Sequence, residues 1–159
     1  MNTDRTCCFI GHRDVAATLE LSKKLYVIIE MLITEKHIDT FIFGSKSSFD
    51  ELCRKTVTEI KEKHPHIRRI YARAEHPFID DSYKAYLLQF YDDTYFPAHM
   101  LSAGRASYVE RNLHMIDNSS FCVVYYDSDY TPSNRKSGTK IAFDYAVKRK
   151  RTIINIKDI

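Results

Sequence analysis

The stretch Cys7-Cys8-Phe9-Ile10-Gly11-His12-Arg13 joins an uninterrupted apolar run to a glycine and two polar side chains. Four more short runs follow along the chain, and only the run at 67–72, which contains Arg68 and Arg69, is interrupted by charge. Continuous apolar runs are typical of strands that are buried on both faces, as in a parallel sheet. We therefore expect strands at residues 7–10, 41–43, 67–72, 121–126 and 152–156.

The segments between these strands have helical periodicity. Leu21, Leu25, Ile28 and Leu32 recur at spacings of three and four, which is typical of an amphipathic helix. Strands that alternate with helices indicate an α/β fold, and crossovers between parallel strands are right-handed. We expect a Rossmann-like doubly wound parallel sheet of five strands in the order 3-2-1-4-5, with helices on both faces. The further helices are expected at 49–63, 107–118 and 139–150.

The connection from 73 to 105 is the irregular part of the chain, with one short helix expected at 81–90. A connection of this length in a compact domain is often a functional loop or lid. It contains four tyrosines that could stack on a base, pack the loop on the sheet or form a subunit interface. They are Tyr83, Tyr86, Tyr91 and Tyr95. No repeat or linker is evident, so we expect residues 1–159 to form a single domain.

The composition excludes several classes of protein. The chain has 159 residues and a net charge of +3, which is too mild to indicate nucleic-acid binding but suits a site for an anionic small molecule. No apolar stretch approaches the roughly 20 residues that cross a bilayer, and the first residues are polar. We therefore expect a cytoplasmic protein with a small-molecule partner, no membrane and no nucleic acid. The oligomeric state stays open, and a homo-oligomer is one alternative.

Cysteines and histidines give no sign of a metal site. The four cysteines form no CxxC pair, and Cys7-Cys8 lies inside an apolar run, which favours buried free thiols. His64, His66 and His76 match no ligand spacing and lie beside turn-forming prolines. We expect solvated loop histidines and no metal.

Three of the four glycines follow predicted strands or open a helix. Gly11 ends the first strand, Gly44 begins the turn 44–48, and Gly138 lies in the polar segment 133–139. In parallel sheets, ligands bind outside the carboxyl ends of the strands where the strand order reverses, here between the first and fourth strands. Glycines let backbone N–H groups approach a ligand, and helix N-termini attract anions. Together these turns predict a phosphate cradle, although each glycine alone is more simply a turn residue.

The segment 104–112 is the second candidate feature. Ser107 could cap the helix, with Glu110 completing a capping box. Arg105 would then lie near the helix start, where a guanidinium can bind a phosphate through two hydrogen bonds. Arg111 and Asn112 would follow one turn later, and a surface ion pair is the alternative role for Arg111.

Several established motifs are missing. Neither a P-loop GxxxxGK[ST] nor a GxGxxG fingerprint is present, which disfavours NTPase and dehydrogenase chemistry. There is also no G-x-S-x-G nucleophile elbow. His12 has no nucleophile or partner carboxylate beside it in the sequence, so a binding role is favoured over acid–base catalysis.

At the level of motifs, the chain resembles short, single-domain bacterial members of the SLOG superfamily. This group includes the DNA-processing DprA proteins and the LOG phosphoribohydrolases. The resemblance covers nearly the whole chain in the family's order. It rests on the segments 8–13, 44–50, 105–117, 123–127 and 137–140. It implies a Rossmann-like fold that binds nucleotides or nucleotide-derived signals, with Gly11, His12 and Arg13 as one wall of the site.

Two departures from the family pattern bear on activity. The second turn of the family reads GxxxGxD, which matches Gly44 and Asp50, but Ser48 replaces the second glycine. Asp50 could cap a helix or bind a ribose hydroxyl. The LOG motif PGGxGTxxE matches at Gly138-Thr139, but Ala142 stands where the catalytic glutamate would be. Without that carboxylate, hydrolysis of an N-glycosidic bond is disfavoured.

The sequence therefore predicts binding of a nucleotide or nucleotide-derived small molecule, for sensing or sequestration, without an assigned catalytic residue or cofactor. A phosphoribohydrolase-type enzyme and a nucleic-acid or protein interaction module are the alternatives. The expected ligand-binding residues are Gly11, His12, Arg13, Gly44, Ser45, Asp50, Arg105, Tyr108, Arg111, Asn112, Asp127, Ser137, Gly138 and Thr139.

Overall fold

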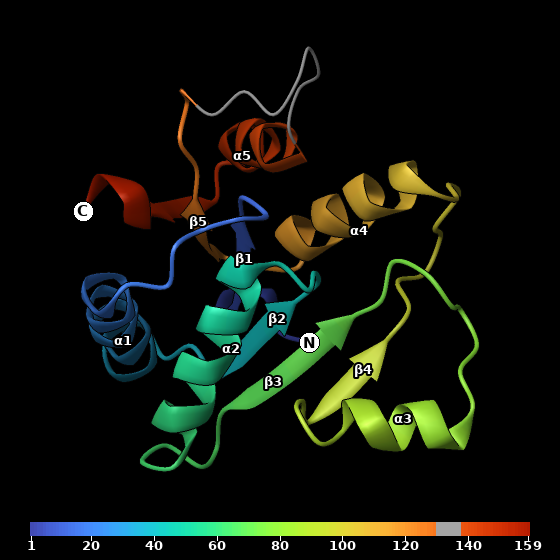
Figure 1. Cartoon of the computed structure of the whole chain (residues 1–159), viewed down its shortest axis with the longest axis horizontal. Coiled ribbons are helices and arrows are strands. Elements are labelled where there is room, and N and C mark those ends of the chain that lie inside the picture. Colours follow the sequence, from blue (N-terminus) through green and yellow to red (C-terminus); the bar gives the residue numbers. More distant parts are fainter. Residues whose placement is uncertain (130–137) are drawn as a thin grey trace.

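A single parallel sheet organises the computed structural model, which describes residues 1–129 and 138–159. Its six strands run in the order β4-β3-β2-β1-β5-β6, with β1 in the interior (Figure 1). Their bounds are β1 Thr6–Gly11, β2 Thr40–Phe43, β3 Arg68–Ala72, β4 Asp93–Tyr95, β5 Phe121–Tyr125 and β6 Thr152–Asn155.

The prediction of five strands in the order 3-2-1-4-5 is wrong, because β4 extends the sheet beyond β3. Strand β4 has only three residues, with Asp93 and Thr94 among them, so it shows no apolar run or alternation in the sequence. Tertiary pairing creates it. Ile70 of β3 lies beside Asp93, and the backbone N–H of Arg73 donates to the Tyr95 carbonyl.

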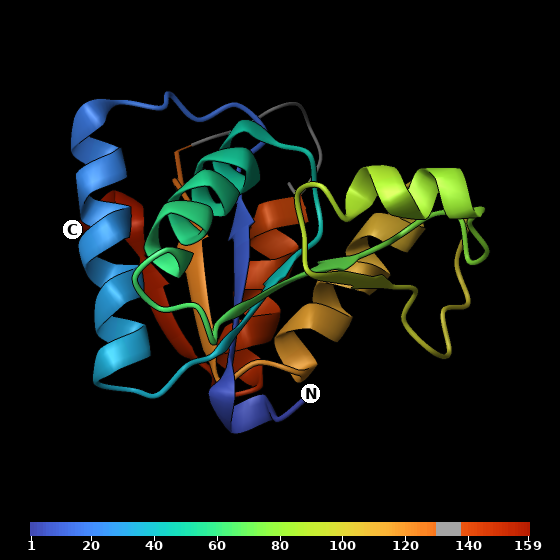
Figure 2. The same cartoon turned by 90° about the horizontal axis from the view of Figure 1, so that it is seen from below.

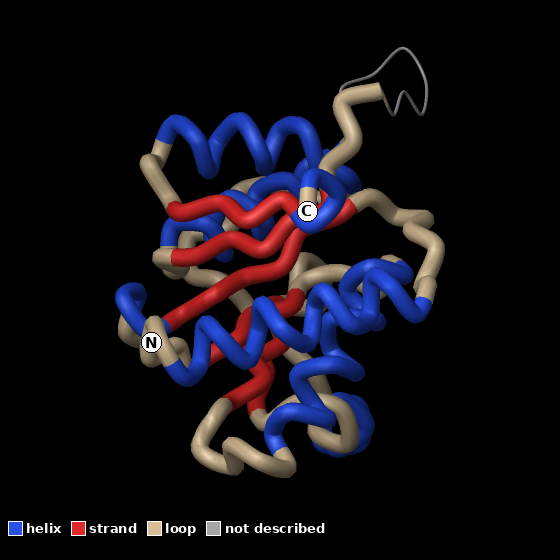
Figure 3. The backbone as a smooth tube through the Cα atoms, turned by 90° about the vertical axis from the view of Figure 1, so that its left-hand side faces the viewer, coloured by secondary structure: helices blue, strands red, loops and turns tan. Residues whose placement is uncertain are grey.

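Helices cover both faces of the sheet (Figures 1 and 2). The side view shows the strands as a central layer between them (Figure 3). The long helices differ by one to a few residues from their predicted ranges, as is usual at frayed ends. Their bounds are α1 Leu19–Thr34, α2 Ser48–Lys61, α3 Asp81–Leu87, α4 Arg105–Asp117 and α5 Gly138–Lys148.

Strand β1 divides the core into two apolar clusters. Phe9 packs in the cluster that contains the buried residues of α1 and α2. Ile10, which points to the other face, packs with Met115 of α4 and Ala142 of α5. All four cysteines are buried free thiols, as their apolar neighbours predict. Within the described residues, no helix combines the length and apolar character needed to span a membrane.

Gly11 and Gly44 make room for side chains from opposite faces of the sheet. A Cβ atom on Gly11 would lie 2.3 Å from the ring of Phe49, which belongs to α2. A Cβ atom on Gly44 would lie 2.7 Å from Nε of Arg111 and 2.5 Å from Sδ of Met115, both on α4. The two glycines therefore allow α2 and α4 to approach the carboxyl edge of the sheet closely.

Candidate functional site

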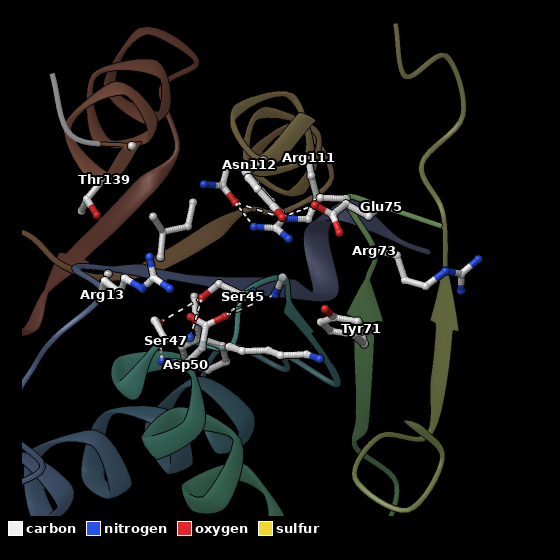
Figure 4. A pocket seen from close by; sticks show the side chains of 18 of the residues that line it. Arg13, Ser45, Ser47, Asp50, Tyr71, Arg73, Glu75, Arg111, Asn112 and Thr139 are labelled. Atoms are coloured by element: carbon white, nitrogen blue, oxygen red, sulfur yellow. Dashed lines mark hydrogen bonds between the residues drawn. The ribbon is translucent and has the colours of Figure 1, made fainter. Parts of the chain in front are cut away.

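A cavity of about 690 Å³ opens at the carboxyl ends of β1, β2 and β3 (Figure 4). Side chains of α4 and the first turn of α5 line it from the other side. Its lining residues are Phe9, Ile10, Gly11, His12, Arg13, Gly44, Ser45, Lys46, Ser47, Asp50, Tyr71, Arg73, Ala74, Glu75, His76, Tyr83, Tyr108, Arg111, Asn112, Gly138 and Thr139.

Most of the predicted ligand-binding residues line this cavity. Arg105 and Asp127 do not, and Ser137 lies outside the described residues. The predicted residues that the fold brings together are Gly11, His12, Arg13, Gly44, Ser45, Asp50, Tyr108, Arg111, Asn112, Gly138 and Thr139. Their role in binding stays a prediction.

The start of α4 differs from the predicted capping box. The helix begins at Arg105 with Gly104 as its N-cap, and no side chain caps it. The hydroxyl of Ser107 donates back to the Gly104 carbonyl, and the Glu110 carboxylate accepts backbone N–H groups from the preceding loop. Arg105 is exposed and does not line the cavity. The positive φ of Gly104, 63°, lets the chain enter the helix three residues earlier than a cap at Ser107 would place it.

His12 connects β1 to the segment after β5. Its Nε2 atom accepts a hydrogen bond of 2.8 Å from the backbone N–H of Asp127. Burial lowers the pKa of His12, which is 3% exposed, so the imidazole is neutral near pH 7. The Asp127 carboxylate forms an ion pair with Lys157 at 3.4 Å, and Asp127 does not line the cavity. Asp127 is therefore connected to the site by its backbone N–H, which donates to His12.

Asp50 holds the turn between β2 and α2. Ser47 is the N-cap of α2, since its hydroxyl accepts the N–H of Asp50. The Asp50 Oδ2 atom accepts the N–H groups of Gly44 at 3.3 Å and Ser45 at 2.8 Å. Its Oδ1 atom is buried and has no hydrogen-bond partner within the described residues. Burial raises the pKa of this carboxyl, opposed by those two N–H groups and by the charge of Arg111.

Arg111 is a buried cation that faces the cavity. The side chain is 4% exposed, and its guanidinium carbon lies 5.6 Å from the centre of the Tyr108 ring. Nε and Nη2 each approach Oδ1 of Asn112 at 3.3 Å, and no carboxylate in the described part of the chain forms an ion pair with it. Burial lowers the pKa of Arg111, although an arginine stays protonated at neutral pH. A buried charge without an ion-pair partner is costly, and a bound anion would supply that partner.

Sequence reasoning missed the third strand's contribution to the site. Tyr71, Arg73 and Glu75 line the cavity from the carboxyl end of β3 and the loop after it. The Tyr108 hydroxyl donates to the Glu75 carboxylate, whereas Nη1 of Arg73 donates to the hydroxyl of Thr94 at 3.0 Å. The rule that ligands lie at the carboxyl ends of strands applies equally to β3. The prediction applied this rule only where the strand order reverses, between β1 and β5, and so it left out Tyr71, Arg73 and Glu75.

No model of a protein family matches the sequence. The sequence is 31% identical over 150 residues to the uncharacterized SPbeta prophage-derived protein YoqJ of Bacillus subtilis (strain 168), and this match covers 82% of each chain. Among solved structures, the fold is similar to that of DNA processing protein A from Helicobacter pylori, with a TM-score of 0.60 and 16% identity. That structure was described for its single-stranded DNA binding mode. The likeness covers 95% of this chain and 64% of that chain, and it shows the DprA-like Rossmann fold that the motifs predict.

Proposed function

We propose that this chain, which belongs to the same family as YoqJ of Bacillus subtilis, binds an anionic nucleotide or nucleotide-derived molecule in the cavity. The observation that carries the proposal is that the buried Arg111 guanidinium faces the cavity and forms no ion pair with any carboxylate among the described residues. A phosphate is the natural partner, because its oxygens accept the paired N–H donors of arginine. As part of the same proposal, residues 1–159 form one domain of the SLOG superfamily.

The remaining lining suits the other parts of a nucleotide. The volume of about 690 Å³ lies within the usual range of ligand pockets, roughly 300–1,000 Å³. Arg13 and Lys46 add positive charge, and the rings of Tyr71 and Tyr83 offer apolar surface to a base. The cavity therefore combines cations for phosphate with aromatic side chains for a planar ring.

Binding without turnover is the form of the proposal that the site favours. Ala142, at the position of the LOG glutamate, is 1% exposed and packs into the core from the buried face of α5. The two carboxylates at the cavity have other partners, because Asp50 accepts backbone N–H groups and Glu75 accepts the Tyr108 hydroxyl. Among the described residues, neither forms a pair with a second carboxylic acid that could protonate a leaving group.

The test is calorimetric titration with adenosine, guanosine, cytidine and uridine 5′-monophosphates, with chromatography of each nucleotide after prolonged incubation. We expect saturable binding of at least one of them, recovered unchanged. Arg111→Met should weaken that binding at least about 30-fold, because a desolvated phosphate–arginine contact is lost. Arg105→Ala is the matched control on the same helix, and its affinity should stay within about twofold. Equal losses in the two variants, or no binding to the wild type, would refute the proposal.

Single-stranded DNA is the second candidate ligand, favoured by the fold likeness to DNA processing protein A. Fluorescence anisotropy with labelled oligonucleotides tests it. If DNA is the ligand, affinity should fall steeply with salt, because phosphate contacts release counterions. An absence of binding at low salt removes this candidate and leaves the mononucleotide proposal standing.

A further inference from the structure

A second, smaller hollow adjoins the cavity on its β3 side. Its volume is about 240 Å³, below the usual range for a whole ligand pocket, so it suits one part of a larger ligand. Ser45, Lys46 and Tyr71 line both hollows. We call the smaller one the aromatic cleft, because its other wall consists largely of Tyr86, Phe90 and Tyr91.

The aromatic wall continues from the cavity into the aromatic cleft. Tyr83 lines the cavity and Tyr86 lines the cleft, and their rings stack on each other with centroids 6.3 Å apart. Tyr71, which lines both, stacks on Tyr91 with centroids 5.0 Å apart and an interplanar angle of 21°. The Tyr86 ring also makes an edge contact with the Phe90 ring, with centroids 5.4 Å apart, and Tyr86 is 51% exposed, so part of its side chain is accessible to a ligand.

Positive charge lies at the junction of the two hollows. Lys46 is exposed, lines both, and has no ion pair with any carboxylate in the part of the chain that the structure describes. Arg54 lies over the ring of Phe90, with its guanidinium carbon 5.0 Å from the ring centre. The carboxylate of Glu51 also lines the cleft, but it pairs with Lys55 at 3.3 Å.

We propose that the ligand is a dinucleotide, an inference that rests on the proposed function. One nucleotide occupies the cavity with its phosphate at Arg111, and the linking phosphate lies at Lys46. The second base occupies the aromatic cleft and stacks on Tyr86. Stacking on an aromatic side chain tolerates every base, because each base has a π-face. The cleft therefore selects for ligand length rather than for a particular second base.

The experiment compares each 5′-monophosphate with the matching 5′-phosphorylated homodinucleotide by calorimetric titration. Wild-type protein should bind the dinucleotide about tenfold more tightly, in line with the usual strength of one base–aromatic stack. Tyr86→Ala should abolish that gain and leave mononucleotide affinity within about twofold. Tyr86→Phe should retain the gain, and Lys84→Ala, an exposed residue of α3 that lines neither hollow, is the matched control.

The possible outcomes separate the two proposals. Equal affinity for mononucleotide and dinucleotide, with both bound, overturns the dinucleotide inference and leaves the proposed function intact. Binding of neither overturns both. A further gain of tenfold or more with 12-residue oligonucleotides would identify a single strand as the occupant and would also overturn the dinucleotide assignment.

Discussion

A partly buried arginine and a buried one lie at opposite ends of the sheet and have different surroundings. At the amino end of β3, Arg69 is held by Asp92, with Nε to Oδ2 and Nη2 to Oδ1 distances of 3.0 Å. Its Nη1 atom also donates to the hydroxyl of Thr58. At the carboxyl edge, Arg111 is more deeply buried, yet its described hydrogen bonds are two contacts of 3.3 Å to Asn112.

On the proposed function, this difference separates a charge that is neutralised within the chain from one that is available for binding. The Arg69 guanidinium is neutralised by a carboxylate from the neighbouring strand segment, so its desolvation is compensated within the chain. The Arg111 guanidinium faces a cavity instead. We therefore expect substitution of Arg69 to change stability and substitution of Arg111 to change binding.

Arg69→Met should have the largest effect on stability. It leaves the partly buried Asp92 carboxylate without its guanidinium partner, and we expect the free energy of unfolding to fall by about 3 kcal/mol. Urea denaturation measures it. Arg68→Met is the control, because that side chain is 53% exposed, pairs with Asp93 at 3.6 Å and should change stability by less than about 0.5 kcal/mol. A loss no larger than the control's would remove the structural role of Arg69.

Asp92→Asn should have a somewhat smaller effect that depends on pH. Hydrogen bonds from Arg69 hold the pKa of Asp92 below its usual value, against the effect of its burial. Its contribution is therefore present above the unfolded pKa of about 3.9 and is lost as pH falls through the folded pKa. We expect a loss of about 2 kcal/mol at pH 7 that shrinks on acidification, measured by urea denaturation at pH 7, 5 and 3. A loss independent of pH would show that the charge of Asp92 is not its source.

Gly44→Ala should affect both stability and binding. The added methyl group would approach the Arg111 and Met115 side chains, so these must move. We expect a loss of about 1–2 kcal/mol and weaker nucleotide binding, because the guanidinium is displaced. Gly138→Ala has open space around the added atom and should be nearly neutral in unfolding experiments. Unchanged binding in Gly44→Ala would show that the position of Arg111 is not critical.

Arg111→Met should have only a small effect on stability and should weaken mononucleotide binding at least about 30-fold. Removing a buried cation without an ion-pair partner relieves its desolvation, which offsets the lost attraction to Asp50. We expect the free energy of unfolding to stay within about 1 kcal/mol of the wild type in urea denaturation. A loss as large as that of Arg69→Met would make Arg111 a structural residue and would weaken the comparison.

The sequence was sufficient to place much of the sheet and its carboxyl edge. The runs around Phe9, Ile42 and Val123 are apolar enough to identify buried strands, and the turn at Gly44 directly follows the run that contains Ile42. Strand β4 could not be predicted, because its three residues have no periodicity and depend on pairing with β3. Its absence from the prediction made the strand number and order wrong.

The candidate site was harder to predict, because it depends on where side chains point. Asp127 follows β5 as expected, but Lys157, from the end of the chain, binds its carboxylate. Arg105 is the first residue of α4, after the N-cap Gly104, and is exposed to solvent. In contrast, Arg111 reaches the cavity because Gly44 leaves space for its side chain. These two residues lie far apart in the sequence, so their contact could not be predicted from it.

The short strand β4 also has a consequence for association between molecules. An exposed sheet edge can recruit strands from other chains and so start aggregation. Here the edge strand has three residues, Asp93 carries an exposed charge on it, and Pro97 follows two residues after its end. Few backbone groups are therefore offered to a neighbouring copy, and proline has no N–H to donate. We therefore expect strand β4 to disfavour pairing of this sheet edge with a strand from another molecule.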